Sequence, residues 1–310
     1  MTEPAILCEA LTRDFNGLRA VDRLDLEISR GEVFAFLGPN GAGKTTTLRL
    51  LIGLIAPTSG SAKVLGLDPQ QDGSRVREKI GVLLEEHGLY EELTAYENLE
   101  YYARIGRLPE ADRGGRIRLL LEGHDLWARR RDKVGKFSKG MKQRLALARA
   151  MITRPRILFL DEPTSGLDPA ATRMVRETIL RLAGEEDITV FLNTHNLDEV
   201  ERVSSRVGII KQGKLLEVGS SREVRARASQ ESVCVRTEGI PGSIAAEIRQ
   251  WQGLRDVTVE GDTLRGILWN GTRPSELVRF LVGLGVGITE VREEQASLEE
   301  VFLQIVEEEP

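Results

Sequence analysis

The stretch Gly38-Pro39-Asn40-Gly41-Ala42-Gly43-Lys44-Thr45-Thr46 fits the pattern Gly-x4-Gly-Lys-Thr. It follows Val33–Leu37, an apolar run typical of a buried strand, and precedes the helix-forming run Leu48–Ile52. Glycines let the backbone turn so that its N–H groups point inward, and the following helix directs its positive end to the same point. The stretch therefore predicts a polyphosphate site, although a glycine-rich turn that happens to contain a lysine would also fit.

This loop pattern also predicts roles for individual side chains. We expect Lys44 to reach the β- and γ-phosphates and the Thr45 hydroxyl to bind Mg²⁺. The remaining residues from Gly38 to Thr46 would surround the phosphates with backbone N–H groups.

Length and composition indicate an ordinary globular protein. With 310 residues and 41% hydrophobic residues, the chain is long enough for about two domains, each with its own core. No window approaches the roughly 18 uncharged apolar residues of a membrane span, and Met1–Pro4 shows no signal-peptide features. We therefore expect a cytoplasmic protein without direct membrane insertion, which only a partner would hold at a membrane.

Charge and cysteine content exclude other classes. The net charge of −5 argues against a nucleic-acid binder, so we interpret the basic cluster Arg129–Lys133 as a solvated face, although a phosphate groove is the alternative. Cys8 and Cys234 lie far apart in apolar segments. They are predicted to be buried free thiols, which fits a reducing compartment.

The N-terminal region is predicted to form strands. Ala5–Leu11 and Leu24–Ile28 are strand-like runs around a turn at Asn16-Gly17. Phe15, just before the turn, could stack on an adenine ring or simply pack on the sheet. After the phosphate loop, Pro57–Gly60 is predicted to be a loop, and two further strands follow it: Ala62–Leu67 and Lys79–Leu84.

The middle of the chain predicts a helical insertion followed by buried strands. From Gly88 to about Leu126, apolar residues recur at three- and four-residue spacing, as in Tyr96–Ile105 and Ile117–Leu121. Continuous apolar runs, typical of a mostly parallel sheet covered on both faces, then return. These runs are Ile157–Leu160 and Ile188–Leu192, and a hairpin through Gln212-Gly213 follows over Val207–Val218.

Beyond Gly219 the pattern predicts a separate β-α-β-β-α-β module, which is the ferredoxin-like order. An amphipathic helix, Leu298–Val306, ends the chain. The predicted elements of the module are Ser232–Arg236, Ser243–Trp251, Asp256–Glu260, Thr263–Trp269, Pro274–Leu284 and Val286–Val291.

Two carboxylates come directly after a predicted strand. Asp161 and Glu162 follow Ile157–Leu160, at the carboxyl edge of the sheet where ligands of such folds bind. We expect Asp161 to hold Mg²⁺ and Glu162 to polarise an attacking water. The alternative is a pair of loop acids that merely end a strand.

A helix start precedes this acidic pair. Phe137-Ser138-Lys139-Gly140-Met141 opens a helix-like run, which alone is a common N-cap pattern. Together with the loop and the acids, it resembles the signature of the nucleotide-binding subunits of ABC transporters, usually Leu-Ser-Gly-Gly-Gln. Lys139 and Met141 depart from that signature. The resemblance implies that Ser138 and the N–H of Gly140 bind the γ-phosphate of ATP held by a second subunit.

Three further positions gain roles from the resemblance. Ser165–Pro169 resembles the family's D-loop, with Asp168 at the nucleotide, and Asn193-Thr194-His195 resembles its switch histidine. A lone histidine is more often structural, but a neutral His195 after a strand could bond the γ-phosphate and orient Glu162. Phe15 corresponds to the family's adenine-stacking aromatic residue.

One position departs from the family pattern. Where the Q-loop usually has glutamine, Ile80–Leu84 is followed by Glu85. A carboxylate can bind Mg²⁺ but cannot donate a hydrogen bond. Glu85 is therefore expected to be a metal-side or coupling residue.

The resemblance implies a complete architecture. The fold class is α/β: a P-loop ABC cassette with a mixed, mostly parallel sheet over residues 1–222, a helical subdomain at about 88–153, and a small α+β ferredoxin-like domain over 223–310. The single cassette and the C-terminal module resemble the ABC-2 or drug-resistance type. That type implies an ATP- and Mg²⁺-dependent homodimer on the inner face of the membrane, which powers a separately encoded permease, mostly in export.

Rival functions stay open at this point. A soluble ABC-type ATPase acting on DNA or ribosomes is one, although the interval from Lys44 to Leu160 leaves no room for a long coiled coil. A small-molecule kinase built on the same loop is another, but it would lack the signature and the D-loop. The C-terminal module could be a ligand-sensing regulator or a dimer brace.

Overall fold

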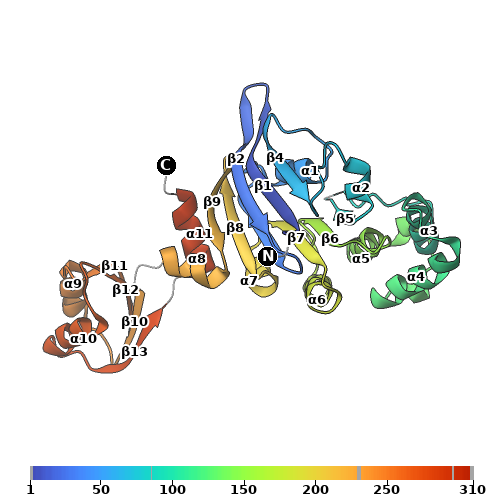
Figure 1. Ribbon diagram of the computed structural model, residues 1–310. Coiled ribbons are helices and arrows are strands. Elements are labelled where there is room, and N and C mark those ends of the chain that lie inside the picture. Colours follow the sequence, from blue (N-terminus) through green and yellow to red (C-terminus); the bar gives the residue numbers. More distant parts are fainter. Residues whose placement is uncertain (1–2, 85, 229–231, 295–296, 308–310) are drawn as a thin grey trace. The chain divides into compact units, whose positions relative to one another are not determined.

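The computed structural model describes residues 3–84, 86–228, 232–294 and 297–307. The chain divides into two compact units, Met1–Ser221 and Arg222–Pro310. Figure 1 shows the elements of both units. Each unit has its own apolar core, as the composition predicts.

A six-stranded sheet forms the centre of the first unit. Its strand order is β5-β6-β7-β3-β8-β9, parallel throughout except for the antiparallel edge strand β9. Every residue of β3, β6 and β7 is buried, which confirms the prediction of strands covered on both faces. The strands are β3 Val33–Leu37, β5 Ile80–Leu83, β6 Ile157–Asp161, β7 Thr189–Thr194, β8 Arg206–Lys211 and β9 Lys214–Gly219.

Aromatic rings fill one side of this sheet. The Phe191 ring lies 5.9 Å from that of Phe34, 5.5 Å from that of Phe36 and 5.6 Å from that of Phe159. All four side chains are fully buried. These contacts between neighbouring strands rigidify the platform from whose carboxyl edge the loops described below emerge.

Helices cover the sheet and form a lateral cluster. The helices α3, α4 and α5 lie together at one end of the sheet (Figure 1), and their apolar residues share one core with β6 and β7. The helices of the first unit are α1 Lys44–Leu51, α2 Gly73–Arg77, α3 Ala95–Ile105, α4 Glu110–Gly123, α5 Lys139–Ala150, α6 Pro169–Glu186 and α7 Leu197–Val203, with 3-10 turns at Trp127–Arg129 and Val134–Lys136.

A second, antiparallel sheet of three strands has the order β2-β1-β4. Its members β1 (Ile6–Phe15) and β2 (Leu18–Ile28) turn at Asn16-Gly17 as predicted. Both strands extend beyond the predicted apolar runs because their polar ends continue the backbone ladder, with Phe15 paired to Leu18.

Strand β4 spans Ser59–Val64, so the predicted range Ala62–Leu67 begins and ends too late in the chain. Ser59 pairs with Thr12 of β1, although the sequence indicates a loop there. Leu65 and Gly66 have positive φ angles of 52° and 76°, and they turn the chain before Leu67. Polar residues on an edge strand give no hydrophobic periodicity, which explains the error.

The second unit has the predicted β-α-β-β-α-β order. Its sheet order, β11-β12-β10-β13, is that of a ferredoxin-like module, with antiparallel pairing throughout. The elements are β10 Ser232–Thr237, α9 Gly242–Gln250, β11 Leu254–Glu260, β12 Thr263–Leu268, α10 Pro274–Gly283 and β13 Ile288–Glu294, flanked by α8 Ser221–Ala228 and α11 Leu298–Glu307.

The two cysteines, the basic cluster Arg129–Lys133 and the hydropathy of the helices bear on the predictions made from composition. Cys8 and Cys234 are both buried and form no disulfide within the described residues, and burial raises the pKa of the Cys8 thiol to about 12. In the basic cluster, Arg129 bonds Asp132 and Lys133 bonds Glu92. Among the described residues, no helix is both long enough and apolar enough to cross a lipid bilayer.

Candidate functional site

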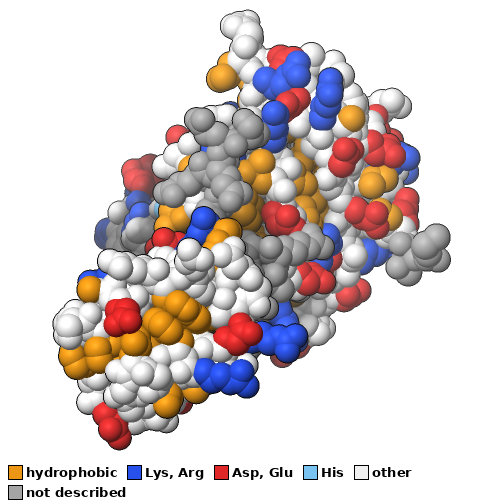
Figure 2. Space-filling view, turned by 90° about the vertical axis from the view of Figure 1, so that its left-hand side faces the viewer, with side chains coloured by type: hydrophobic (Ala, Val, Ile, Leu, Met, Phe, Trp, Pro, Cys, Tyr) orange, Lys and Arg blue, Asp and Glu red, His pale blue; other side chains and the backbone are white. Residues whose placement is uncertain are grey.

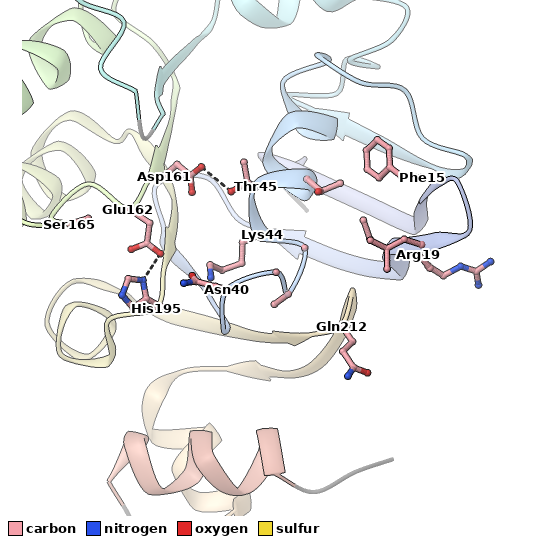
Figure 3. Close-up of a pocket in the computed structure, with 16 residues that line it drawn as sticks. Phe15, Arg19, Asn40, Lys44, Thr45, Asp161, Glu162, Ser165, His195 and Gln212 are labelled. Carbon is pink, nitrogen blue, oxygen red and sulfur yellow. Dashed lines mark hydrogen bonds and ion pairs between the residues drawn. The ribbon is translucent and has the colours of Figure 1, made fainter.

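A pocket of about 850 Å³ lies at the carboxyl edge of the parallel sheet, bordered by the β1–β2 turn (Figure 3). Loops that follow β3, β6, β7 and β8 supply most of its walls. The lining residues are Phe15, Leu18, Arg19, Ala20, Asn40, Gly41, Ala42, Gly43, Lys44, Thr45, Thr46, Asp161, Glu162, Ser165, His195 and Gln212. The structure therefore brings most of the predicted site residues together in one cavity.

The glycine-rich loop from Gly38 to Gly43 connects β3 to α1. At its two ends, Gly38 and Gly43, the structure leaves no room for a side chain. Gly43 has φ 106°, and a Cβ there would lie 2.3 Å from the carbonyl oxygen of Ala20. A Cβ on Gly38 would lie 2.4 Å from the carbonyl oxygen of Ile210. The loop is thus fixed against β2 and β8, with the first N–H groups of α1 directed at the pocket.

Lys44 is the first residue of α1 and its side chain is buried. Its Nζ donates to the carbonyl oxygens of Gly38 at 2.6 Å and Pro39 at 3.1 Å. Burial lowers the pKa of Lys44, whereas the nearby carboxylates of Glu162 and Asp161 act in the opposite direction. A buried ammonium beside the loop N–H groups is well placed to bind a polyanion.

Thr45 and Asp161 lie together (Figure 3). The Thr45 hydroxyl donates to Oδ2 of Asp161 at 3.1 Å. Both side chains offer oxygen ligands, which Mg²⁺ prefers, and Mg²⁺ at phosphate sites commonly uses one or two protein oxygens together with phosphate and water. Among the described residues, no group of three or more His, Cys, Asp or Glu side chains is arranged so that it could hold a metal ion. These two residues therefore fit a phosphate-bound Mg²⁺ and not a cage made by protein alone.

Glu162 and His195 form the second polar contact of the pocket. Nδ1 of His195 lies 2.8 Å from Oε1 of Glu162, and Figure 3 shows the two side chains meeting at the pocket edge. Glu162 has φ 50°, the left-handed region that is uncommon for a residue with a side chain. Its N–H donates to the Asn193 carbonyl at 2.9 Å, which holds this conformation.

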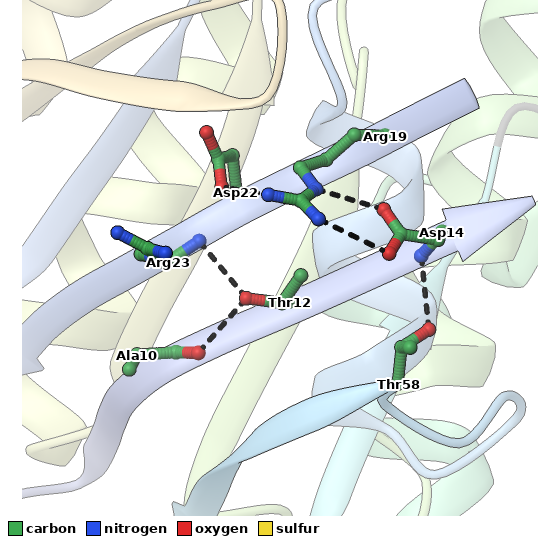
Figure 4. A network of polar contacts seen from close by, with 7 residues as sticks. All are labelled: Ala10, Thr12, Asp14, Arg19, Asp22, Arg23 and Thr58. Atoms are coloured by element: carbon green, nitrogen blue, oxygen red, sulfur yellow. Dashed lines mark hydrogen bonds and ion pairs between the residues drawn. The ribbon is translucent and has the colours of Figure 1, made fainter. Parts of the chain in front are cut away.

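The opposite side of the pocket carries Phe15, whose side chain is 39% exposed. The guanidinium carbon of Arg13 lies 4.3 Å from the Phe15 ring centroid, so a cation supports the ring. Nearby, Arg19 is held by Asp14 at 2.9 Å and Asp22 at 3.1 Å (Figure 4). Hydrogen bonds to these carboxylates raise the pKa of Arg19.

The network of Figure 4 also anchors this ribbon to its neighbours. The N–H of Asp14 donates to Oγ1 of Thr58 at 3.0 Å, which joins β1 to the segment before β4. Oγ1 of Thr12 accepts from the N–H of Arg23 and donates to the Ala10 carbonyl. The Phe15 edge of the pocket is therefore fixed by bonds that extend across the whole antiparallel sheet.

Five described residues among the predicted nucleotide contacts lie outside the pocket lining: Gly38, Pro39, Ser138, Gly140 and Asp168. Ser138 is the N-cap of α5 and accepts from the N–H of Met141 at 3.3 Å. Asp168 is the N-cap of α6 and accepts from the N–H of Ala171 at 2.9 Å. A Cβ on Gly140 would lie 3.2 Å from that of Ala171 and 4.0 Å from Oδ2 of Asp168, so α5 and α6 begin side by side. Glu85 lies outside the described residues.

Sequence reasoning missed several polar residues around the site. Asn193 is fully buried, and its Nδ2 donates to Oδ1 of Asp161 at 3.2 Å. Gln143 of α5 donates to the Pro163 carbonyl at 2.5 Å, which ties the helix that begins at Ser138 to the loop after Glu162. No spacing rule indicates these contacts, because each joins elements distant in the chain.

Glu199 supports the loop that carries His195. It is fully buried and accepts from the Thr194 hydroxyl at 2.8 Å. Burial raises the pKa of Glu199. The signal in the sequence was weak, because an acid in the first turn of a helix, as in α7, is usually exposed.

Fold and pocket together define an ATPase of the P-loop type, and comparison with known proteins gives its family. The profile of the family described as "ABC transporter" matches residues 21–165, and the profile "ATP-binding protein DrrA1-3-like, C-terminal domain" matches residues 219–306. The chain belongs to the ATP-binding proteins of ABC transporters, within the drug-resistance type.

Two curated relatives span nearly the whole chain. The bacitracin transport ATP-binding protein BcrA of Bacillus licheniformis is 35% identical over 96% of this chain and 95% of its own length. The daunorubicin resistance ATP-binding protein DrrA3 of Streptomyces coeruleorubidus is 35% identical over 98% of this chain and 96% of its own length.

Solved structures agree with the fold. CbiO1 of Clostridium perfringens, part of an ABC transporter complex, is 28% identical over 73% of this chain and 92% of that one, with a TM-score of 0.67. A dimeric ATP-binding cassette with bound ADP and Pi is 25% identical over 69% of this chain and 98% of its own, with a TM-score of 0.63. The predicted fold class and the ATPase class are both confirmed.

Proposed function

We propose that two copies of this chain, arranged head to tail, enclose two MgATP molecules. The observation that carries this proposal is the division of the predicted contacts: the phosphate loop, Asp161 and Glu162 line one pocket, whereas Ser138 and Gly140 lie outside it. A second copy would bring its Ser138 and the N-terminus of its α5 to the open side of the pocket. The similar cassette that was solved as a dimer with ADP and Pi supports the pairing of two copies.

Within each site, the chain's own residues have distinct tasks. Phe15 stacks on the adenine, and the residues from Gly38 to Thr46, with Lys44, bind the phosphates. Thr45 and Asp161 would hold Mg²⁺, which when bound would supply positive charge beside the phosphate oxygens. Asp168 acts at the dimer contact beside its neighbour Gly140. We assign Glu85 a role either beside the Mg²⁺ ion or in coupling the ATP site to the permease.

Hydrolysis depends on Glu162 and His195. The Glu162 carboxylate accepts a proton from the attacking water and orients it in line with the γ-phosphate. His195 holds that carboxylate in place through its Nδ1 contact and directs its remaining ring nitrogen to the phosphate. ATP binds the closed dimer more tightly than the open dimer, so ATP binding drives closure. Hydrolysis removes this preference and lets the dimer open.

The dimer powers export by a separately encoded membrane permease of the ABC-2 type. Two curated relatives are named for bacitracin transport and daunorubicin resistance, so we assign an antibiotic-like substrate class to the permease. The helical segment 88–135 would contact the permease, with the exposed side chains of Tyr90, Tyr101 and Ile105 in that segment. The chain would therefore work in the cytoplasm, on the inner face of the membrane.

The Glu162→Gln substitution tests the catalytic assignment. It keeps the shape of the side chain but removes the base, so we expect ATP hydrolysis to fall at least about 100-fold while ATP binding persists. Trapped ATP should then make a dimer visible by size-exclusion chromatography. The matched control is Glu177→Gln, an exposed acid on α6 paired with Arg173, and it should hydrolyse ATP normally. Normal turnover by the Glu162→Gln variant would refute the assignment.

A soluble ATPase that acts on a macromolecule is the alternative. The transport and resistance names of the curated relatives favour the permease-coupled function. Purification from detergent-solubilised membranes separates the two, because a permease-coupled subunit should be recovered with an integral membrane protein. Recovery without one would favour the soluble ATPase.

A further inference from the structure

A second cavity, of about 420 Å³, lies at the opposite edge of the parallel sheet from the nucleotide pocket. Its walls include Pro155 and Arg156, immediately before β6, and Ile188 and Thr189, where β7 begins. The nucleotide pocket lies beyond the other ends of these strands, at Asp161, Glu162 and His195. The two cavities share no lining residue.

The lining of this cavity is strongly cationic. Among the described residues it contains four arginines, Arg30, Arg116, Arg154 and Arg156, and only one carboxylate, Asp187. The chain as a whole has a net charge of −5, so the local charge opposes the overall charge. Like charges that share a cavity repel one another, and an anion between them removes that repulsion.

Two of the arginines are fixed by backbone carbonyls. Arg30 follows β2, and its Nε donates to the Glu3 carbonyl at 3.1 Å, with Glu3 Oε2 at 3.4 Å from Nη2. Arg116 lies on α4, and its Nη2 donates to the Met151 carbonyl at 2.6 Å. These bonds hold both side chains at the cavity from two different parts of the first unit.

The other two arginines have a fixed backbone but side chains that are free to bind. The N–H of Arg156 donates to the Lys79 carbonyl at 2.7 Å, and its carbonyl accepts from Thr189 at 3.1 Å. The N–H of Arg154 donates to the Met151 carbonyl at 3.2 Å. Within the described part of the chain, neither guanidinium makes a hydrogen bond or an ion pair.

We propose that this arginine cavity binds a phosphate-bearing anion. The planar guanidinium group presents paired N–H donors that match two oxygens of a phosphate, and several such groups favour a ligand with more than one negative charge. Such a ligand could be a free polyphosphate or the headgroup of an anionic phospholipid, since both present the same chemistry. The proposal adds a site to the nucleotide pocket and does not depend on the proposed transport function.

Binding of inorganic pyrophosphate to the full chain tests the proposal. Saturating ADP first fills the nucleotide pocket, and pyrophosphate is then titrated by calorimetry. We expect binding to the unmodified chain and at least a tenfold loss of affinity in the Arg154→Ala/Arg156→Ala double variant. The matched control is Arg118→Ala/Arg173→Ala, which removes two exposed arginines that pair with Glu122 and Glu177 outside the cavity.

A second arm distinguishes the two sources of phosphate. Sedimentation with phosphatidylglycerol vesicles should deplete the unmodified chain, and the double variant should be depleted less, if the ligand is a lipid headgroup. Pyrophosphate binding without vesicle binding identifies a soluble anion. Equal behaviour of the double variant and its control in both arms overturns the proposal, as does the absence of binding by the unmodified chain in both. ADP affinity, measured for each variant, reports whether the fold is intact.

Discussion

Asp161 shows how single residues set the geometry of the site. Each of its two carboxylate oxygens has one fixed donor: the Thr45 hydroxyl at 3.1 Å from Oδ2 and the Asn193 amide at 3.2 Å from Oδ1. Asn193 is fully buried, and its own Oδ1 has no partner among the described residues. An unpaired polar atom in a buried side chain lowers stability. We therefore infer that the role of Asn193 is to hold the Asp161 carboxylate and not to stabilise the fold.

Replacement of Asn193 by leucine should separate orientation of the metal ligand from nucleotide binding. Leucine has a similar volume but no donor, so Asp161 can rotate and hold Mg²⁺ less well. We expect ATP hydrolysis to fall roughly tenfold at low Mg²⁺ and to recover in part at high Mg²⁺. The measurement is the ATPase rate as a function of Mg²⁺ concentration, with magnesium-free nucleotide affinity as the control. An unchanged Mg²⁺ dependence would contradict this role.

These residue contacts mark where prediction from sequence stops. Lys44, Thr45, Asp161 and Glu162 were predicted because their chemistry is written in short local patterns. Asn193 and Glu199 were missed because the Asn193–Asp161 and Glu199–Thr194 bonds depend on which strands and helices become neighbours. The left-handed backbone of Glu162 has no local signal either, because no glycine or asparagine occupies that position.

At the scale of elements, the end of α4 contains a buried histidine. His124 is the C-cap of α4, and its Nδ1 donates to the Leu120 carbonyl at 2.8 Å, which leaves Nε2 as the unprotonated nitrogen. Burial lowers the pKa of His124, and the charges of Arg181 and Arg144 act in the same direction, against the Leu120 bond and Asp125. The helical cluster therefore folds around a neutral imidazole.

This burial predicts a loss of stability in acid. Because the folded pKa lies below the ordinary value of about 6.5, the unfolded chain binds a proton more readily as the pH falls below that value. The free energy of unfolding should fall between about pH 7 and pH 5. His124→Asn, which keeps a side-chain donor but does not titrate, should lose less over this range. Urea unfolding of both chains at each pH is the measurement, and identical slopes would refute the assignment.

The predicted element boundaries agree with the structure where apolar periodicity is strong. The helix α3 was predicted to within one residue, and the order of elements along the second unit was predicted correctly, because one face of each element is buried. Strand β4 was displaced, because Ser59–Ala62 carries no apolar alternation and is ordered only by pairing with β1. Pairing partners of polar edge strands are a tertiary property that local patterns do not contain.

At the scale of the whole molecule, chemistry and accessory structure occupy different units. Every residue that lines the nucleotide pocket lies between Phe15 and Gln212, within the unit Met1–Ser221. The second unit has a separate apolar core that includes Val235, Leu264 and Leu277. The division into an ATP-binding domain over 1–222 and an accessory domain over 223–310 stays a prediction.

A chain that ends at Ala228, which keeps α8 whole, should therefore fold and bind ATP without the rest of the second unit. Its affinity for a fluorescent ATP analogue should match that of the full chain within about twofold, because no pocket contact is removed. ATP-dependent dimerisation of the Glu162→Gln form, measured by size-exclusion chromatography, then reports the role of the second unit. Undiminished dimerisation would exclude a dimer brace and favour a regulator, whereas loss of dimerisation with intact ATP binding would identify the brace. A truncated chain that unfolds without cooperativity would contradict the independence of the two units.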